Sequence, residues 1–206
     1  YNFAGIADIE EASRMPLETV KTNILCTAII LEACKKAKVK RFIFASSIYV
    51  YSRTGGFYRS SKQACELLIE NYQEVYKIPY TILRYGSLYG PRANDKNPIY
   101  RMLTQAITKK KIQREGDGEE LREYIHVWDA ARMSTEILSD EFKNQSVIIA
   151  GNQQMKVKDF FVMIKEILDN KITIDYVPQK SKLHYEITPY TFAPKVAQRY
   201  VSKTYL

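Results

Sequence analysis

Residues 39–47 read Val-Lys-Arg-Phe-Ile-Phe-Ala-Ser-Ser, and residues 58–62, soon after, read Tyr-Arg-Ser-Ser-Lys. The apolar triplet Phe42-Ile-Phe44 is typical of a strand that is buried on both faces in a parallel sheet. The strand ends in two serines, and a helical pattern begins near Tyr58. A strand that leads through a short loop into a helix predicts one unit of an alternating α/β fold.

The same alternation of apolar patterns extends to both sides of this unit. Apolar residues that recur every three or four positions predict amphipathic helices, and the short apolar runs between them predict buried strands. The expected elements are strands at Tyr1–Ile6, Val39–Ala45 and Tyr80–Arg84, and helices at Leu17–Lys38 and Lys62–Tyr76. This order predicts an α/β protein with a parallel sheet and helices on its faces.

The rhythm changes after Pro91, where the elements become more varied. The expected elements are helices at Asn97–Lys109, 129–138 and Val157–Asp169, and strands at Ile112–Gly118, Glu123–Val127, Val147–Ala150 and Ile172–Val177. We expect Asp129 to be the N-cap of its helix. Residues 92–206 are predicted to form a smaller lobe, with residues 122–150 partly returning to the sheet formed by residues 1–91.

Length, charge and composition exclude several classes of protein. The chain has 206 residues, of which 46% are hydrophobic and 26% charged, and this is ordinary for a globular protein and unlike a disordered or fibrous one. Its net charge of +8 is scattered along the chain, so no nucleic-acid partner is expected. No apolar run reaches the roughly 20 residues that span a bilayer, so no membrane partner is expected either.

The three cysteines, Cys26, Cys34 and Cys65, lack the spacing of a disulfide framework or a thiolate metal site. We therefore expect no metal and a cytoplasmic protein. All three fall in helical apolar patterns, so we expect them to be buried as small hydrophobic residues.

Tyr58 and Lys62 are spaced so that both lie on one face of a helix. A phenol with an ordinary pKa of about 10 is a poor base at neutral pH, and a neighbouring ammonium favours its ionised form. Ligands of open parallel sheets bind beyond the carboxyl ends of the strands, which is where Ser47 lies. Ser47 can therefore hydrogen-bond the same substrate oxygen that Tyr58 deprotonates.

Several stretches, taken in order, carry more specific motifs. They are Asn2-Phe-Ala-Gly5, Asn23-Ile-Leu-Cys-Thr27, Phe44–Ser52 followed by Tyr58–Lys62, Leu83–Arg92, and Gly116-Asp-Gly118 followed by Arg122–Asp129. Together they resemble the extended short-chain dehydrogenase/reductase family, and within it the NAD-dependent nucleotide-sugar epimerases and dehydratases. The resemblance implies a Rossmann-type doubly wound parallel sheet with a smaller α/β substrate-binding lobe. Residues 1–91 would be the C-terminal half of the NAD-binding domain.

The resemblance implies a role for each matching residue. Tyr58 would be the catalytic acid and base, Lys62 would bind the nicotinamide ribose and lower the pKa of Tyr58, and Ser47 would be their catalytic hydroxyl partner. The implied NAD-binding residues are Ala4, Gly5, Asn23, Ser46, Tyr58, Lys62 and Tyr85. The implied substrate-binding residues are Ser47, Ser87, Arg92 and Arg122. Arg122 would meet the diphosphate, which suits a planar guanidinium, and Ser87 stands where the family often has asparagine.

The implied reaction is the transient oxidation of a nucleotide-diphosphate sugar to a keto-sugar and its re-reduction from the other face, most simply at C4. Two alternatives stay open: an NAD(P)-dependent nucleotide-sugar reductase or dehydrogenase, and a catalytically silent cofactor-binding protein. The family's 4,6-dehydratases carry Asp-Glu after their catalytic threonine, whereas Ile48-Tyr49 follows Ser47. This difference favours epimerisation or reduction over elimination of water. The helices at Leu17–Lys38 and Lys62–Tyr76 would pair in a homodimer.

Other features differ from the family pattern. No Gly-x-Gly-x-x-Gly loop occurs in the chain, so we expect the pyrophosphate-binding strands to precede residue 1 and this piece to be inactive alone. The loop from Ser47 to Tyr58 is shorter than usual, which predicts an atypical substrate. His126 is expected to be a packed core residue. His184-Tyr185 and Thr188–Tyr190 are candidates for contact with substrate or a dimer partner, and no motif assigns them.

Overall fold

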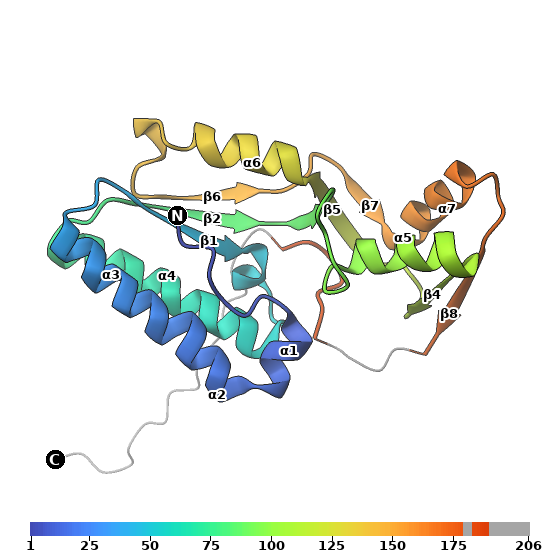
Figure 1. The fold of residues 1–206 in the computed structure, drawn as a ribbon, viewed down its shortest axis with the longest axis horizontal. Helices are drawn as coiled ribbons and strands as arrows, with labels where there is room; N and C mark the ends of the chain where they lie inside the picture. Colours follow the sequence, from blue (N-terminus) through green and yellow to red (C-terminus); the bar gives the residue numbers. More distant parts are fainter. Residues whose placement is uncertain (179–182, 190–206) are drawn as a thin grey trace, which may run out of the picture.

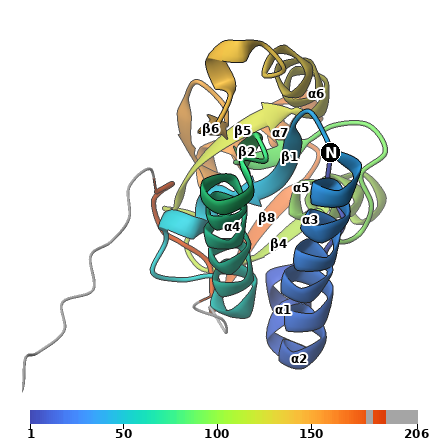
Figure 2. The same ribbon diagram turned by 90° about the vertical axis from the view of Figure 1, so that its left-hand side faces the viewer.

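The computed structural model describes residues 1–178 and 183–189 and shows an α/β protein built from two adjoining parts (Figure 1). In the first part, three parallel strands lie in the order β1 (Phe42–Ser47), β2 (Tyr80–Tyr85) and β6 (Gln145–Ile149). Helices α3 (Cys26–Ala37) and α4 (Gly56–Tyr76) cover one face of this sheet, and α6 (Val127–Glu136) covers the other (Figures 1 and 2). The α/β fold predicted from the sequence is confirmed.

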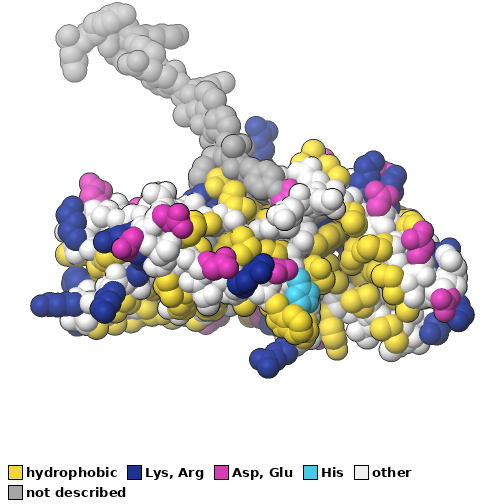
Figure 3. Space-filling model, turned by 90° about the horizontal axis from the view of Figure 1, so that it is seen from above, with side chains coloured by type: hydrophobic (Ala, Val, Ile, Leu, Met, Phe, Trp, Pro, Cys, Tyr) yellow, Lys and Arg dark blue, Asp and Glu magenta, His cyan; other side chains and the backbone are white. Residues whose placement is uncertain are grey.

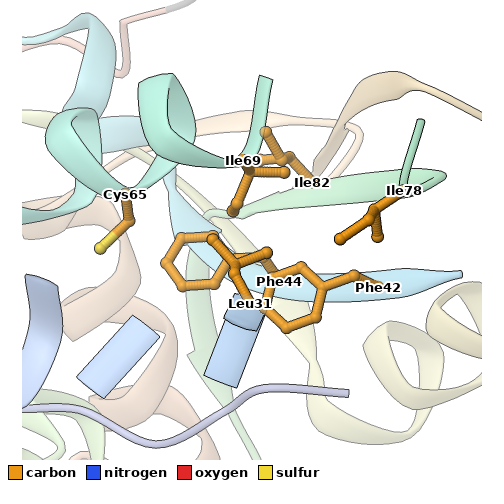
Figure 4. Packing of buried hydrophobic residues seen from close by; sticks show 7 residues of the cluster. All are labelled: Leu31, Phe42, Phe44, Cys65, Ile69, Ile78 and Ile82. Carbon is orange, nitrogen blue, oxygen red and sulfur yellow. The ribbon is translucent and has the colours of Figure 1, made fainter. Parts of the chain in front are cut away.

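Strand β1 is apolar throughout because helices pack on both of its faces. Phe42 and Phe44 contact α3 and α4, whereas Ile43 between them contacts the opposite layer, as the period of two in a strand requires. The cluster on the α3–α4 face, drawn in Figure 4, consists of Leu31, Phe42, Phe44, Cys65, Ile69, Ile78 and Ile82. The cluster on the α6 face consists of Ile43, Leu83, Ile125, Ala130, Ile137 and Ile149.

The helix predicted at Leu17–Lys38 is divided in the structure. It comprises α2 (Pro16–Thr19), a π-helical stretch η1 (Val20–Leu25) and α3, and a separate helix α1 (Ile9–Arg14) precedes it. π-Helical turns are rare and occur frequently at functional sites. The π-helical stretch here contains Asn23, which is buried and holds the N-terminal segment of the chain.

The prediction of a strand at Tyr1–Ile6 is wrong, except that one residue of the segment pairs with the sheet. Asn2 forms an isolated parallel bridge with Phe44 at the edge of the sheet. Farther along, the N–H of Ile6 donates to Asn23 Oδ1 at 2.7 Å instead of pairing with a strand. Side-chain acceptors compete with strand pairing for backbone N–H groups, and the segment therefore leaves the sheet after a single bridge.

The second part of the molecule is built on small sheets. Strand β5 (Leu121–His126) pairs in parallel with β3 (Ser87–Tyr89) and antiparallel with β7 (Gln154–Lys156), and β4 (Lys111–Glu115) pairs in parallel with β8 (Thr173–Val177). Helices α5 (Pro98–Lys109) and α7 (Val157–Ile167) pack on β4 and β8 (Figure 1). The core of this part consists of Ala106, Ile112, Val157, Phe161, Ile164 and Ile172.

Short elements escape prediction from the sequence. Strands β3 and β7 have three residues each and α1 has six, which is too few to display a period. The 3₁₀ turns η2 (Ile48–Tyr51) and η3 (Asp140–Phe142) are also missed. Most longer elements lie where they were predicted, with ends shifted by one or two residues, whereas α4 begins six residues earlier than expected.

Helix α6 is capped by His126, and the prediction that Asp129 is its N-cap is wrong. Nδ1 of His126 accepts a hydrogen bond from the N–H of Trp128 at 3.3 Å. Asp129 lies in the first turn, where it pairs with Arg132 at 3.0 Å. His126 is half-buried at the end of β5, so it is a helix cap rather than the packed core residue that was expected.

Charged side chains are dispersed on the face that Figure 3 shows, where Lys and Arg lie scattered among Asp and Glu. Across residues 1–178 and 183–189, no helix is long and apolar enough to cross a membrane. In the same ranges, no group of three or more His, Cys, Asp or Glu side chains could hold a metal ion. Cys65 is buried as expected, Cys34 is half-buried, and Cys26 is exposed because it lies on the outer side of α3.

Replacing Phe161 with alanine tests the core of the second part. Phe161 is fully buried on α7, so we expect Phe161→Ala to lower the free energy of unfolding by about 3–5 kcal/mol in urea denaturation. The control is Val162→Ala on the same helix, which should change it by less than about 0.5 kcal/mol because Val162 is 48% exposed. Equal effects of the two variants would contradict the position of α7.

Candidate active site

Strand β1 ends in two serines whose side chains lie on opposite faces of the sheet, because successive residues of a strand alternate. Ser46 Oγ lies 2.5 Å from Glu66 Oε1 of α4. Ser47 Oγ accepts a hydrogen bond from the N–H of Tyr49 at 3.3 Å and also hydrogen-bonds the phenol of Tyr58. The structure thus brings Ser47 and Tyr58 together and directs Ser46 elsewhere.

A glycine turn allows α4 to begin close to β1. Gly55, the N-cap of α4, has a φ of 101°, and a Cβ at this position would lie 2.7 Å from the ring of Tyr49. The turn places Tyr58 in the first turn of the helix, one turn before Lys62. Nζ of Lys62 lies 5.8 Å from the centre of the Tyr58 ring. The two side chains therefore face the same region, as their spacing predicts.

Lys62 is held beneath the site in an almost dry environment. It is 6% exposed, its Nζ donates to the carbonyl of Ala45 at 2.8 Å, and it lies 4.9 Å from the centre of the Phe44 ring. Burial lowers the pKa of Lys62, and the nearby Cys65 and Glu66 oppose this effect. The ammonium is therefore poised closer to neutrality than an exposed lysine would be.

Tyr58 is 8% exposed, and burial raises its pKa while the hydrogen bond with Ser47 acts in the opposite direction. The desolvated phenol thus favours its protonated form. The protonated phenol can donate a proton to a ligand oxygen. The phenolate, when a positive charge beside it stabilises it, can accept one.

A buried ion pair lies between α4 and the sheet. Glu66 and Arg84 are 4% and 9% exposed, and Arg84 meets the carboxylate with two nitrogens, Nη2 at 2.6 Å and Nε at 3.1 Å. Arg84 Nη1 also donates to the hydroxyl of Tyr51, and Ser46 adds its hydroxyl to the same carboxylate. Bidentate geometry and these added hydrogen bonds offset the cost of desolvating two charges. This network occupies Ser46.

The N-terminal segment reaches the site through Asn23. The amide of Asn23 accepts from Ile6 N–H at 2.7 Å and donates to the Ile6 carbonyl at 3.0 Å and to Ser61 Oγ at 2.9 Å. A Cβ at Gly5 would lie 2.9 Å from Asn23 Oδ1 and 3.9 Å from Lys62 Nζ. Asn23 therefore holds the bare backbone of Gly5 close to Lys62. Ala4 is exposed at the start of this segment.

Two adjacent cavities, of about 620 and 870 Å³, open between the two parts of the molecule. The smaller one brings together six of the residues implicated by the sequence: Gly5, Ser47, Tyr58, Tyr85, Ser87 and Arg122. The others, Ala4, Asn23, Ser46, Lys62 and Arg92, do not line either cavity. Arg92 lies on an exposed turn, and the hydroxyl of Tyr85 is 2.5 Å from Ser134 Oγ.

Arg122 and Arg114 line both cavities. The Arg122 guanidinium lies 4.2 Å from the centre of the Tyr185 ring, and its Nη1 donates to the carbonyl of Leu121 at 2.9 Å. Arg114 pairs with Glu120, and its buried Nε has no hydrogen-bond partner among the described residues. Two guanidinium groups beside one cavity can bind an anionic ligand with several oxygens.

Tyr49 and Arg114 also line the smaller cavity, and neither was predicted from the sequence as a site residue. Tyr49 follows Ser47 by two positions, which is the one local signal that could have found it. Arg114 precedes the Gly116-Asp-Gly118 turn, but its approach to Arg122 depends on contacts between distant segments. His184 and Tyr185, which the sequence left unassigned, line both cavities, and Tyr190 lies outside the described residues.

The residues around Lys62 fit the ribose end of NAD. The ammonium has three donors, and among the described residues it uses one of them, for the carbonyl of Ala45. The remaining donors suit the vicinal hydroxyls of a ribose. The ring of Tyr58 lies near the same ammonium. Gly5 has no side chain, and its backbone lies beside Lys62. A Cβ at Gly5 would occupy part of the space next to the ammonium.

Comparison with known proteins identifies the family. The sequence profile of the NAD dependent epimerase/dehydratase family matches residues 1–151, and the chain belongs to this family. A protein of Bacillus subtilis described as an uncharacterized UDP-glucose epimerase is 27% identical over 75% of this chain and 53% of that protein. Human dTDP-D-glucose 4,6-dehydratase is 24% identical over 80% of this chain and 52% of the enzyme. The chain thus spans about half the length of these curated relatives.

Solved structures share the fold closely. UDP-glucuronic acid 4-epimerase from Bacillus cereus, in complex with UDP-glucuronic acid and NAD, has a TM-score of 0.83 and 25% identity, covering 96% of this chain and 70% of that chain. UDP-glucose 4-epimerase from Thermotoga maritima, with UDP-glucose, has a TM-score of 0.83 and 24% identity, covering 92% and 67%. The second likeness is one of fold alone.

The Glu66–Arg84 pair predicts strong thermodynamic coupling. We expect Glu66→Ala and Arg84→Ala each to lower the free energy of unfolding by about 3–5 kcal/mol, because each leaves an unpaired buried charge. The double variant should fall short of the sum by about 1–3 kcal/mol. The exposed pair of Asp129 and Arg132 is the control, with an expected coupling of about 0.2–0.5 kcal/mol. Additive effects at Glu66 and Arg84 would contradict the pairing.

Proposed function

We propose that this chain is the catalytic and substrate-binding portion of an NAD-dependent epimerase that acts on a nucleotide-diphosphate sugar, most simply at C4. The observation that carries the proposal is the hydrogen-bonded pair of Ser47 and Tyr58 in a cavity, with the Lys62 ammonium 5.8 Å from the Tyr58 ring. In this proposal residues 1–91 belong to the cofactor-binding domain and residues 92–206 to the substrate lobe.

The roles follow from the chemistry of the three side chains. Tyr58 removes a proton from a sugar hydroxyl and later returns one, and Ser47 hydrogen-bonds the same oxygen so that it faces the phenol. NAD, when bound, supplies a reversible acceptor for a hydride. Lys62 holds the ribose of NAD, and its positive charge favours the phenolate of Tyr58 during proton removal.

The substrate's diphosphate belongs with Arg122 and Arg114. Both line the two cavities, and the Nε of Arg114 has no partner among the described residues. Ser87 lines the smaller cavity together with these arginines and Tyr58. Arg92, which the family pattern also implicates, lies on an exposed turn and has no contact with either cavity. We therefore assign the diphosphate to Arg122 and Arg114 without Arg92.

Epimerisation is favoured over elimination of water by the residues after Ser47. Ile48 is 1% exposed and apolar, and Tyr49 is a phenol whose pKa is raised, so neither supplies an acidic group at neutral pH. The Bacillus cereus enzyme with UDP-glucuronic acid and NAD supports the same class of substrate and cofactor. The chemical test is incubation of the full gene product with UDP-sugars, followed by detection of the C4 epimer. Net formation of NADH in proportion to product would sink the epimerase proposal.

Removing the phenol of Tyr58 should abolish turnover. General acid–base groups contribute about 10²–10⁴-fold, so we expect Tyr58→Phe to lower kcat of the full gene product by at least about 100-fold. The loss of one hydrogen bond, with Ser47, should reduce stability by only about 1 kcal/mol. Tyr72→Phe is the control, because its phenol donates to Glu32 between α3 and α4. Unchanged turnover in Tyr58→Phe would refute the assigned role.

We further propose a homodimer formed through α3 and α4. Exposed apolar side chains on these two helices include Ile29, Leu67 and Val75, each at least 58% exposed. Leu67→Glu would place a charge in such an interface, and the gene product should then change from dimer to monomer in light scattering. Leu138→Glu, also exposed but next to α6, is the control and should remain dimeric. A wild-type protein that is monomeric at micromolar concentration would contradict the dimer.

A further inference from the structure

The segment 183–188 closes one side of the smaller cavity. Leu183 packs against the cluster that contains Tyr58 and Ile9. At its other end, the carbonyl of Glu186 accepts from the N–H of Leu121 at 2.8 Å. The segment therefore connects the α1–α4 side of the molecule to strand β5 across the cavity, and it carries His184 and Tyr185 with it.

Tyr49 joins this segment to the active site. Its ring lies edge-on to Tyr58 with centres 6.1 Å apart, and it packs on Tyr185 with centres 4.7 Å apart. Its hydroxyl is 2.8 Å from Nδ1 of His184. Tyr49 and His184 both line the smaller cavity, and His184 lines the larger one as well. Tyr49 thus contacts both Tyr58 and Tyr185, and the Arg122 guanidinium lies against the Tyr185 ring.

The hydrogen bond fixes which ring nitrogen of His184 carries the proton. A phenol is a better donor than a neutral imidazole, and the other nitrogen of a neutral imidazole is an acceptor. Tyr49 O–H therefore donates to Nδ1, and the proton of His184 is on Nε2. Desolvation and the charges of Arg122 and Arg114 lower the pKa of His184, and Glu10 and Asp8 oppose them, which leaves a neutral ring. Among the described residues, Nε2 has no hydrogen-bond acceptor, and the ring is exposed along the cavities.

We propose that His184 donates a hydrogen bond from Nε2–H to a hydroxyl of the bound sugar, and that Tyr49 is the positioning residue that sets its tautomer. The proposal rests on the proposed function, because it assigns the sugar to this cavity. In this proposal, His184 determines specificity because it recognises one hydroxyl next to the carbon on which Tyr58 acts.

A sugar hydroxyl suits this position better than a phosphate oxygen. Arg122 and Arg114 already supply charged donors for an anion on the far side of Tyr185. His184 is a neutral donor whose partner Tyr49 contacts the ring of Tyr58. A neutral donor next to the proton-transfer group matches an uncharged hydroxyl, because a buried anion would need a charged partner.

The tautomer can be measured without any ligand. The chain has two histidines, so ¹⁵N spectra of the imidazoles are assigned by comparing the wild type with His126→Asn, which retains a capping residue at α6. We expect His184 to be a single Nε2–H tautomer in the wild type and a mixture of both tautomers in Tyr49→Phe. An Nδ1–H tautomer in the wild type, or an unchanged single tautomer in Tyr49→Phe, would overturn the role of Tyr49.

Ligand affinity tests the contact itself. In calorimetry on the full gene product, His184→Phe should weaken UDP-glucose by about tenfold and leave UDP unchanged, because one hydrogen bond to the sugar is lost. His184→Gln, which keeps an N–H donor near the position of Nε2, should restore most of the affinity, and His126→Asn should match the wild type. Equal weakening of UDP and UDP-glucose would place the contact on the diphosphate and overturn the proposal, as would no weakening.

The two proposals fail in different ways. If the wild-type gene product binds neither UDP nor any of UDP-glucose, UDP-glucuronic acid and dTDP-glucose, the proposed function is wrong and the sugar contact falls with it. If the wild type binds and His184→Phe binds equally well, the proposed function stands and the role of His184 is wrong. The tautomer measurement decides the role of Tyr49 in both cases.

Discussion

The alternation of side chains along β1 is the constraint on which the candidate active site depends. Because Ser46 and Ser47 are successive residues of one strand, their hydroxyls must point to opposite faces. One completes a buried ion pair with α4, and the other enters the cavity beside Tyr58. Helix α4 is fixed against the strand by the first of these contacts, and it therefore presents Tyr58 and Lys62 to the second. The contact that holds α4 in place and the candidate site are thus built from successive residues at the end of one strand.

The electrostatics of the site follow from its dryness. Burial shifts the pKa of Tyr58 upward and that of Lys62 downward, so burial disfavours the charged form of each group. The positive charge of Lys62 beside the phenol favours the phenolate, so charge acts against burial at Tyr58.

The sequence was sufficient for features that are local or periodic. The spacing of Tyr58 and Lys62 predicts their common face, and the apolar run before Ser47 predicts a buried parallel strand. Features that depend on distant partners were not predictable. Residues 1–6 look like a strand until Asn23 takes the N–H of Ile6, and the capping role of His126 depends on where β5 ends.

The same distinction applies to the site. Ser47 and Tyr58 are joined by a short loop, and sequence proximity was enough to place them together. Ser46 was predicted as a cofactor contact, and its hydroxyl lies on Glu66 in a network that also needs Arg84 from β2. No local sequence pattern predicts that Arg84 of the next strand contacts the carboxylate of Glu66.

The contact between Tyr49 and His184 has a consequence for the order in which the molecule is completed. The two residues are separated by 135 positions in the chain. At synthesis rates of about 5–20 residues per second, roughly 7–27 s pass between the emergence of one and that of the other. During that interval, Ile9 and Ala12 are available to pack on Tyr58, whereas Leu183 and His184 are not yet made. The side of the cavity that these two residues form is therefore completed last.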